Sequence, residues 1–149
     1  MKITLCGSIA FFDRMQEAEK RLKEFGYLVK LPPREIVDPS GNRMSVKDNY
    51  EIRKATQQND SWIWAAKREV MREHFDNVMW ADVIVVLNYD KDGIANYIGA
   101  NTLLEMGLAF HHRKKIYLLN PIPEMSYKEE VLAMHPTVLR GDLLLIQKA

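Results

Sequence analysis

The stretch "DVIVVLN" at residues 82–88, apolar without a break between its two polar ends, constrains the fold more than any other segment of this chain. Four consecutive β-branched residues, 83–86, favour a strand over a helix. A strand that is apolar on both faces offers no side to water, so it belongs inside a parallel sheet that helices cover on both sides. The run therefore predicts a central strand of an α/β protein.

Strand and helix signals alternate along the rest of the chain. Strands are predicted at residues 2–6, 27–31, 82–88, 115–120 and 141–146. Helices are predicted from Asp13 to a stop at Gly26, from about Ser45, from about Asp60 to Trp80, from about Thr102 to His112 and from Ser126 to Met134, with a loop over 34–44. Three helix starts fit a capping box, formed by Asp13 with Gln16, Thr102 with Glu105, and Ser126 with Glu129. This alternation predicts a mostly parallel, doubly wound sheet.

Length and charge limit the classes of protein that fit. The 149 residues suit one domain, residues 1–149, with a helical insert at about 45–80. The formal net charge is only +1, so neither a nucleic-acid polymer nor an anionic membrane is favoured as a partner. The single cysteine, Cys6, excludes an internal disulfide and suggests a reducing compartment. No signal peptide or membrane-spanning run is evident, and we expect a cytoplasmic protein.

Ligands of doubly wound sheets bind beyond the carboxyl ends of the strands, which directs attention to the loops after Cys6, Leu87 and Leu119. None of these loops carries the glycine pattern of a dinucleotide site, a P-loop or a nucleophile elbow. His111 and His112 are adjacent and cannot share one helix face as a metal pair does. The sequence therefore predicts neither a cofactor nor a metal, and Cys6 is expected to be a buried structural residue.

Glu105 is a charged residue within the apolar stretch "GANTLLEMGLAF" at 99–110. As part of a capping box, it would reach back to the Thr102 amide. Alternatively, a carboxylate in the first turn is kept ionised by the helix dipole and can attack the anomeric carbon of a sugar. The free amides near Gly99–Thr102 would then bind an anion such as a phosphate. The pattern by itself leaves both interpretations open.

The stretches "LCGSIAFFDRM", "ADVIVVLN" and "YIGANTLLEMGLA" together resemble the nucleoside 2-deoxyribosyltransferase superfamily, which includes the 2'-deoxynucleoside 5'-phosphate N-hydrolases. The resemblance covers about residues 1–31 and 74–120. It implies a flavodoxin-like or Rossmann-like three-layer sandwich with a mostly parallel five-stranded sheet. It also implies a homodimer or larger assembly, no cofactor and no metal.

The resemblance further implies roles for individual residues. Glu105 would be the nucleophile, and Gly7, Ser8 and Ile9 would line the sugar and phosphate pocket. Gly99 and Asn101 stand where relatives place small or hydroxyl residues at the phosphate or sugar. The chain departs from these relatives in three places. His74, with Asp76 two residues later, takes the place of an aspartate of the hydrolases, and the stretch 88–98 is longer than in the nucleotide hydrolases. Ala10 takes the place of an arginine for which Arg14 could substitute.

Five further residues have both a functional and a structural interpretation. Asp90 and Asp92 would bind or protonate the leaving base, or else form a turn. Tyr97 would orient the Glu105 carboxylate, or pack in the core. Phe11 would stack on a nucleobase or staple the first helix, and Asn88 would bind a sugar hydroxyl or cap a turn.

These observations favour an N-glycosidase that acts on nucleosides or nucleoside 5'-monophosphates by a retaining mechanism, ending in hydrolysis or in transfer to a second base. A non-catalytic nucleotide-binding sensor of the same fold is the alternative. A flavodoxin-like redox module fits less well, because no hydroxyl-rich phosphate loop follows the first strand.

Overall fold

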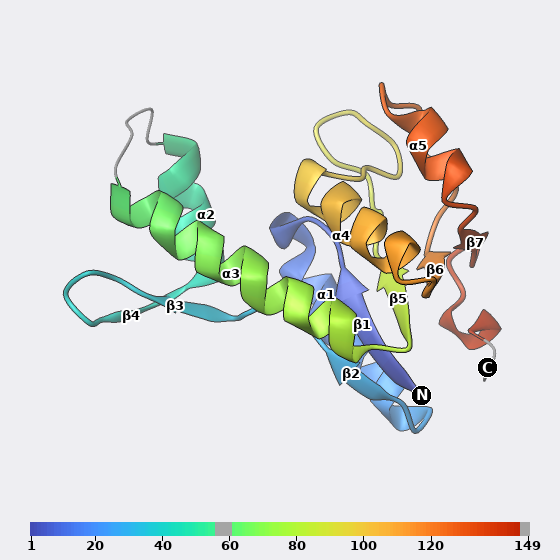
Figure 1. Cartoon of the computed structure of the whole chain (residues 1–149), viewed down its shortest axis with the longest axis horizontal. Coiled ribbons are helices and arrows are strands. Elements are labelled where there is room, and N and C mark those ends of the chain that lie inside the picture. Colours follow the sequence, from blue (N-terminus) through green and yellow to red (C-terminus); the bar gives the residue numbers. More distant parts are fainter. Residues whose placement is uncertain (56–60, 147–149) are drawn as a thin grey trace.

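The fold is built on a five-stranded parallel sheet, seen in a computed structural model that describes residues 1–55 and 61–146 (Figure 1). Its strands are β1 (Lys2–Cys6), β2 (Leu28–Lys30), β5 (Val83–Val86), β6 (Lys115–Leu118) and β7 (Thr137–Val138). They pair in the order β2-β1-β5-β6-β7, every pair parallel. Counted along the chain, this is the 2-1-3-4-5 order of flavodoxin-like sheets, so the expected α/β fold is confirmed.

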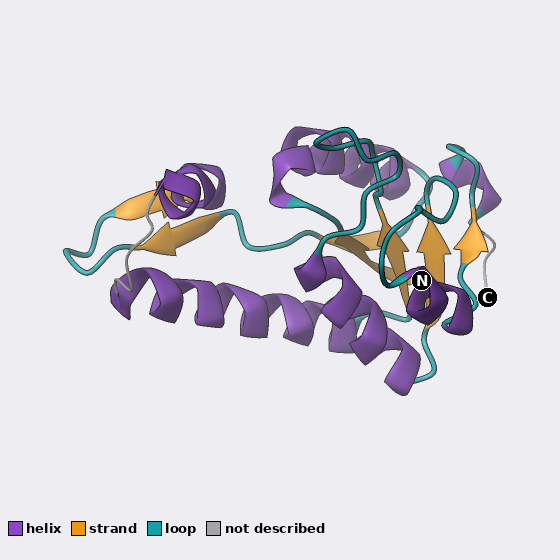
Figure 2. Ribbon diagram, turned by 90° about the horizontal axis from the view of Figure 1, so that it is seen from above, coloured by secondary structure: helices purple, strands orange, loops and turns teal. Residues whose placement is uncertain are grey.

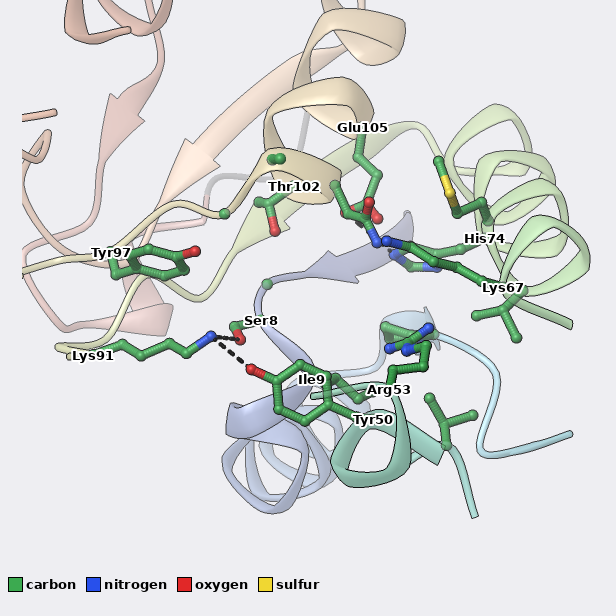
Figure 3. Close-up of a pocket in the computed structure, with 18 residues that line it drawn as sticks. Ser8, Ile9, Tyr50, Arg53, Lys67, His74, Lys91, Tyr97, Thr102 and Glu105 are labelled. Atoms are coloured by element: carbon green, nitrogen blue, oxygen red, sulfur yellow. Dashed lines mark hydrogen bonds and ion pairs between the residues drawn. The ribbon is translucent and has the colours of Figure 1, made fainter. Parts of the chain in front are cut away.

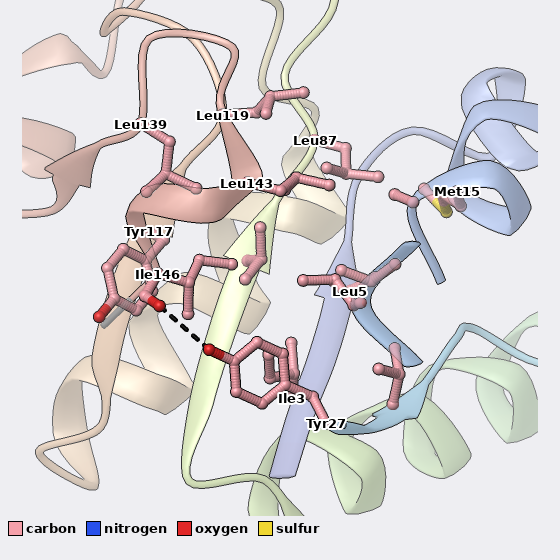
Figure 4. Close-up of a cluster of buried hydrophobic side chains, with 14 of the residues drawn as sticks. Ile3, Leu5, Met15, Tyr27, Leu87, Tyr117, Leu119, Leu139, Leu143 and Ile146 are labelled. Atoms are coloured by element: carbon pink, nitrogen blue, oxygen red, sulfur yellow. Dashed lines mark hydrogen bonds between the residues drawn. The ribbon is translucent and has the colours of Figure 1, made fainter. Parts of the chain in front are cut away.

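Helices cover both faces of the sheet and complete a three-layer sandwich (Figure 2). Helix α1 (Phe12–Glu24) and a 3-10 turn, η2 (Leu143–Leu145), pack on one face, against side chains such as Ile3 and Leu5 (Figure 4). Helices α4 (Ala100–His111) and α5 (Lys128–Ala133) and the end of α3 (Ser61–Trp80) pack on the other. All four residues of β5 are buried, as its unbroken apolar sequence predicts.

Helix α1 forms because Met15, Ala18 and Leu22 recur on one face and are buried there. It ends at Glu24, and Gly26, whose φ of 83° suits glycine, follows the C-cap residue Phe25. The Tyr27 amide donates to the Leu22 carbonyl in a Schellman arrangement. The predicted capping box at its start is wrong. The helix begins one residue before Asp13, no side chain caps it, and the Asp13 carboxylate pairs with Lys47 instead.

A hairpin and two helices project beyond the sheet and form an arm (Figure 1). The hairpin pairs β3 (Glu35–Val37) with β4 (Arg43–Ser45), so the predicted loop over 34–44 is wrong. Asp38 closes the hairpin, because its carboxylate accepts the Ser40 and Asn42 amides at 2.9 Å. Helix α2 (Val46–Ala55) follows at the predicted position, and Ser45 Oγ accepts the Asp48 amide. The predicted start of the next helix, Asp60, lies outside the described residues.

The C-terminal predictions need two corrections. Residues 141–146 do not form a strand. They contain the 3-10 turn η2, which starts where the Asp142 carboxylate accepts the Leu144 amide. The fifth strand is β7, which lies earlier in the chain. The capping box predicted at Ser126 is also wrong, since α5 begins at Lys128 without a side-chain cap. No helix in the described part of the chain is long and apolar enough to cross a membrane.

Candidate active site

A cavity of about 280 Å³ opens at the carboxyl ends of β1 and β5 (Figure 3). The order of the strands switches at this point of the sheet, which is where doubly wound folds bind their ligands. The walls come from the turn after β1, from the loop after β5 with the first turns of α4, and from α2 and α3 of the arm. The cavity therefore lies between the sheet and the arm.

Glu105 lies within the second turn of α4 and not at its cap. The helix begins at Ala100, two residues before the predicted start, and Gly99 is its N-cap residue. The first helical hydrogen bond runs from the Leu103 amide to the Gly99 carbonyl, so Thr102 is a helical residue. The predicted Thr102–Glu105 capping box is therefore wrong, as is the placement of Glu105 in the first turn. Glu105 is 7% exposed, and its Oε2 has no hydrogen-bond partner among the described residues.

Two other buried side chains converge on the Glu105 carboxylate. His74, on α3, places Nε2 3.5 Å from Glu105 Oε2, and neither of its ring nitrogens is hydrogen-bonded to a described residue. Cys6 ends β1, and its thiol, His74 and Glu105 offer atoms that all lie within 4.8 Å of one another. Burial, with the Glu105 carboxylate beside it, raises the pKa of the Cys6 thiol well above its usual value. Because these residues are far apart in sequence, no local motif reveals the cluster.

The turn after β1 passes very close to the neighbouring strand. A Cβ on Gly7 would lie 3.0 Å from the Leu87 carbonyl oxygen and 2.9 Å from Met15 Cε, so only glycine fits there without displacement. Ser8 follows, and its Oγ accepts the Ala10 amide at 3.4 Å, which starts a short 3-10 turn over Ile9–Phe11. The turn brings Gly7, Ser8 and Ile9 to the cavity wall.

Three cationic side chains line the same cavity as Glu105. Lys91, from the loop after β5, donates to Ser8 Oγ at 3.2 Å and to the Tyr50 hydroxyl at 3.0 Å (Figure 3). Although burial opposes it, the Tyr50 hydroxyl raises the pKa of Lys91. Arg53, on α2, and Lys67, on α3, have lowered pKa values because of burial, and the charge of Arg53 contributes at Lys67. Within the described residues, none of the three cations forms an ion pair.

Most of the residues predicted from the sequence line this cavity. These are Gly7, Ser8, Ile9, Tyr97, Gly99, Asn101, Thr102 and Glu105. Tyr97 lies beside Lys91, whose Nζ is 4.8 Å from the centre of the Tyr97 ring. Tyr97 and Glu105 both line the cavity, but no hydrogen bond joins these two described residues.

Four predicted residues do not line the cavity. Asp90 accepts the Asn96 amide within its loop, and Asp92 is exposed with a left-handed φ of 51°. Phe11 is buried, and its ring packs edge-on against Tyr89. Asn88 is fully buried, and its amide group donates to the backbone of the loop after β6.

Four polar residues of the cavity are not among those predicted from the sequence, and three of them belong to the arm. Tyr50, Arg53 and Lys67 come from α2 and α3, while Lys91 comes from the loop after β5. His74, one of the departures from the relatives, lines the cavity, whereas Asp76 does not. Arg14 does not reach the cavity either. Its guanidinium carbon lies 4.4 Å from the centre of the Tyr89 ring.

No protein-family model matches the sequence, and no curated protein does. Two solved structures are similar. A 2-deoxyribosyltransferase from the psychrotolerant bacterium Bacillus psychrosaccharolyticus is 20% identical, with a TM-score of 0.51 over 84% of this chain and 76% of that one. The CMP N-glycosidase BcmB of Clostridium botulinum is 18% identical, with a TM-score of 0.49 over 93% of this chain and 85% of that one. This chain therefore shares the fold of a 2-deoxyribosyltransferase.

Proposed function

We propose that this protein is an N-glycosidase of the nucleoside 2-deoxyribosyltransferase superfamily, acting on nucleosides or nucleoside 5'-monophosphates with Glu105 as its nucleophile. One observation carries the proposal. The Glu105 carboxylate is buried at the cavity wall with one oxygen free of hydrogen bonds to the described residues, close to the glycine–serine turn after β1. The fold shared with a 2-deoxyribosyltransferase supports it.

The chemistry follows from a carboxylate with a free lone pair. A Glu105 oxygen would bond to C1' of the sugar while the bond from C1' to the base nitrogen breaks, and the electron pair of that bond would leave with the base. Water would then attack C1' from the side that the base left, and the proton that it loses would pass to the displaced base, so that the sugar is released and the carboxylate restored. Two inversions at C1' give net retention of configuration. A second base in place of water would make the reaction a transfer.

The charges of the cavity favour a phosphorylated substrate. Arg53, Lys67 and Lys91 bring three positive charges to the walls, against the one negative charge of Glu105. The first backbone amides of α4, residues 100–102, precede the first helical hydrogen bond and lie at the same cavity, where they can bind an anion. We therefore expect a nucleoside 5'-monophosphate to be a better substrate than the nucleoside.

The test is a turnover panel. The protein is incubated with ribo- and deoxyribonucleosides and with their 5'-monophosphates, and free base is measured by chromatography. We expect base release that falls by about 10³-fold or more in Glu105→Gln, because the amide cannot act as the nucleophile. Glu129→Gln, at an exposed position on α5, is the matched control and should retain full activity.

Two outcomes would contradict the glycosidase. Equal turnover in Glu105→Gln and in the native protein would exclude the nucleophile. Binding of a nucleotide without any base release would instead favour the non-catalytic sensor, which would use the same cavity.

A further inference from the structure

The proposed glycosidase reaction uses only one member of the cluster formed by Cys6, His74 and Glu105. These residues come from three different elements, β1, α3 and α4, and each is buried. One thiol sulfur, one imidazole nitrogen and one carboxylate oxygen lie within 4.8 Å of one another, and His74 Nε2 is 3.5 Å from Glu105 Oε2. Around a tetrahedral zinc ion, neighbouring ligand atoms are about 3–4 Å apart, so the cluster needs only small side-chain movements to fit.

The polar atoms of this cluster lack the partners that buried groups normally have. Both ring nitrogens of His74 and the Oε2 atom of Glu105 are buried and make no hydrogen bond to the described residues. Buried polar side chains in proteins are nearly always hydrogen-bonded, and such exceptions call for an explanation. A cation between the three side chains would give Glu105 Oε2 and one nitrogen of His74 a partner.

We propose that Cys6, His74 and Glu105 form a binding site for Zn²⁺. Thiolate and imidazole ligands suit zinc, whereas magnesium and calcium prefer oxygen ligands alone. Three protein ligands would leave one tetrahedral position open. His74 and Glu105 both line the cavity (Figure 3), from which a water molecule or a ligand could reach the ion. Cys6 would bind as the thiolate, and its proton would pass to solvent.

Binding at this site has a consequence for activity, and this consequence rests on the proposed function. A Glu105 oxygen that coordinates Zn²⁺ donates a lone pair to the ion, and this makes the carboxylate a weaker nucleophile toward C1'. The ion would therefore inhibit base release, and its removal by a chelator would restore it.

Cobalt is a suitable probe, because Co²⁺ takes zinc sites and a thiolate ligand gives it an intense charge-transfer absorption. Cys6 is the only cysteine in the chain, so that absorption can come from no other residue. Metal-free protein titrated with Co²⁺ should develop the band to saturation at one ion per chain, and Zn²⁺ should abolish it. Cys6→Ser should remove the band, and His74→Ala should weaken binding by at least about 100-fold. His111→Ala, at an exposed position on α4, should bind as the native protein does.

The outcomes separate the two proposals. Absence of the band in the native protein, or unchanged affinity in His74→Ala while circular dichroism shows a folded chain, overturns the zinc site whatever the turnover panel shows. A saturable band in a protein that releases no base from any substrate keeps the zinc site and overturns the glycosidase. Turnover that Zn²⁺ leaves unchanged at a saturating concentration overturns the inhibition.

Discussion

Gly7 allows the turn after β1 to pass directly over β5. Gly7→Ala would place a methyl group 3.0 Å from the Leu87 carbonyl oxygen, and the backbone must shift to relieve this contact. We expect a loss of about 1–3 kcal/mol in the free energy of unfolding, as for other overpacked positions. Urea denaturation measures it as a lower midpoint at an unchanged slope.

Gly107→Ala is the matched control for this substitution. Gly107 lies within α4, and a Cβ there meets no atom within 4 Å. Alanine in a helix interior should raise the free energy of unfolding by about 0.5–1 kcal/mol. If both substitutions change the urea midpoint in the same direction, the close approach to the Leu87 carbonyl does not determine how stable the protein is with alanine at position 7.

Residues that line the cavity could be anticipated where the sequence resembles a known superfamily. Gly7, Ser8 and Gly99 lie in such stretches, directly after a strand or before a helix, and all three line the cavity. The meeting of His74 with Cys6 and Glu105 could not be predicted in this way, because it depends on how α3 crosses the sheet. Only the three-dimensional packing places these residues within 4.8 Å.

Among the elements, starts of helices were predicted less well than their apolar faces. The apolar face of α1 is buried as predicted, but none of the three predicted capping boxes forms. At α4, Gly99 has the extended backbone of an N-cap residue (φ −80°, ψ 168°), so Thr102 lies inside the helix and cannot cap it. A capping pattern can also occur inside an apolar helix, and tertiary packing decides which residue is the first residue of the helix.

The hairpin β3–β4 offers a test of a single acidic side chain. The hydrogen bond from the Asn42 amide is the largest cause that lowers the pKa of Asp38; desolvation opposes it, and hydrogen bonds from Ser40 and Gly41 lower the pKa further. A carboxylate with a lowered folded pKa contributes stability above its unfolded pKa of about 4, and this contribution is lost as the pH falls through the folded value. We expect Asp38→Ala to speed amide hydrogen exchange in residues 35–45 at neutral pH.

Asp38→Asn separates hydrogen bonding from charge at this turn. The asparagine oxygen can still accept the Ser40 and Asn42 amides, so much of the protection should remain, but without the dependence on pH that the carboxylate confers. Exchange measured by mass spectrometry across acidic and neutral pH distinguishes the variants. Native-like protection in Asp38→Ala at neutral pH would show that strand pairing alone holds the hairpin.

At the scale of the whole molecule, two parts of the chain form the cavity, and the sequence predicted the cavity residues of only one of them. The sheet side, with Gly7, Tyr97 and Glu105, falls within the stretches that resemble a known superfamily. The arm side, with Arg53 and Lys67, lies outside them and carries no motif of its own. Its charged residues could be identified only when α2 and α3 were seen to close over the carboxyl ends of the strands.

A ligand that touches both parts should stabilise the whole fold, because it binds only when the arm and the sheet are both in place. At about 100 times its dissociation constant, a ligand adds about 2.7 kcal/mol, or roughly 5–10 °C in Tm for a chain of this size. We expect the turnover-deficient Glu105→Gln protein to show this rise with a nucleoside 5'-monophosphate, and a smaller one with the nucleoside at the same concentration. The double variant Arg53→Ala/Lys67→Ala on that background should narrow the difference between the two ligands, because only Lys91 and the α4 amides remain to bind the phosphate, whereas Lys20→Ala, at an exposed position on α1, should leave the difference unchanged. An equal rise with both ligands before the arm is altered would mean that these cations do not bind the phosphate.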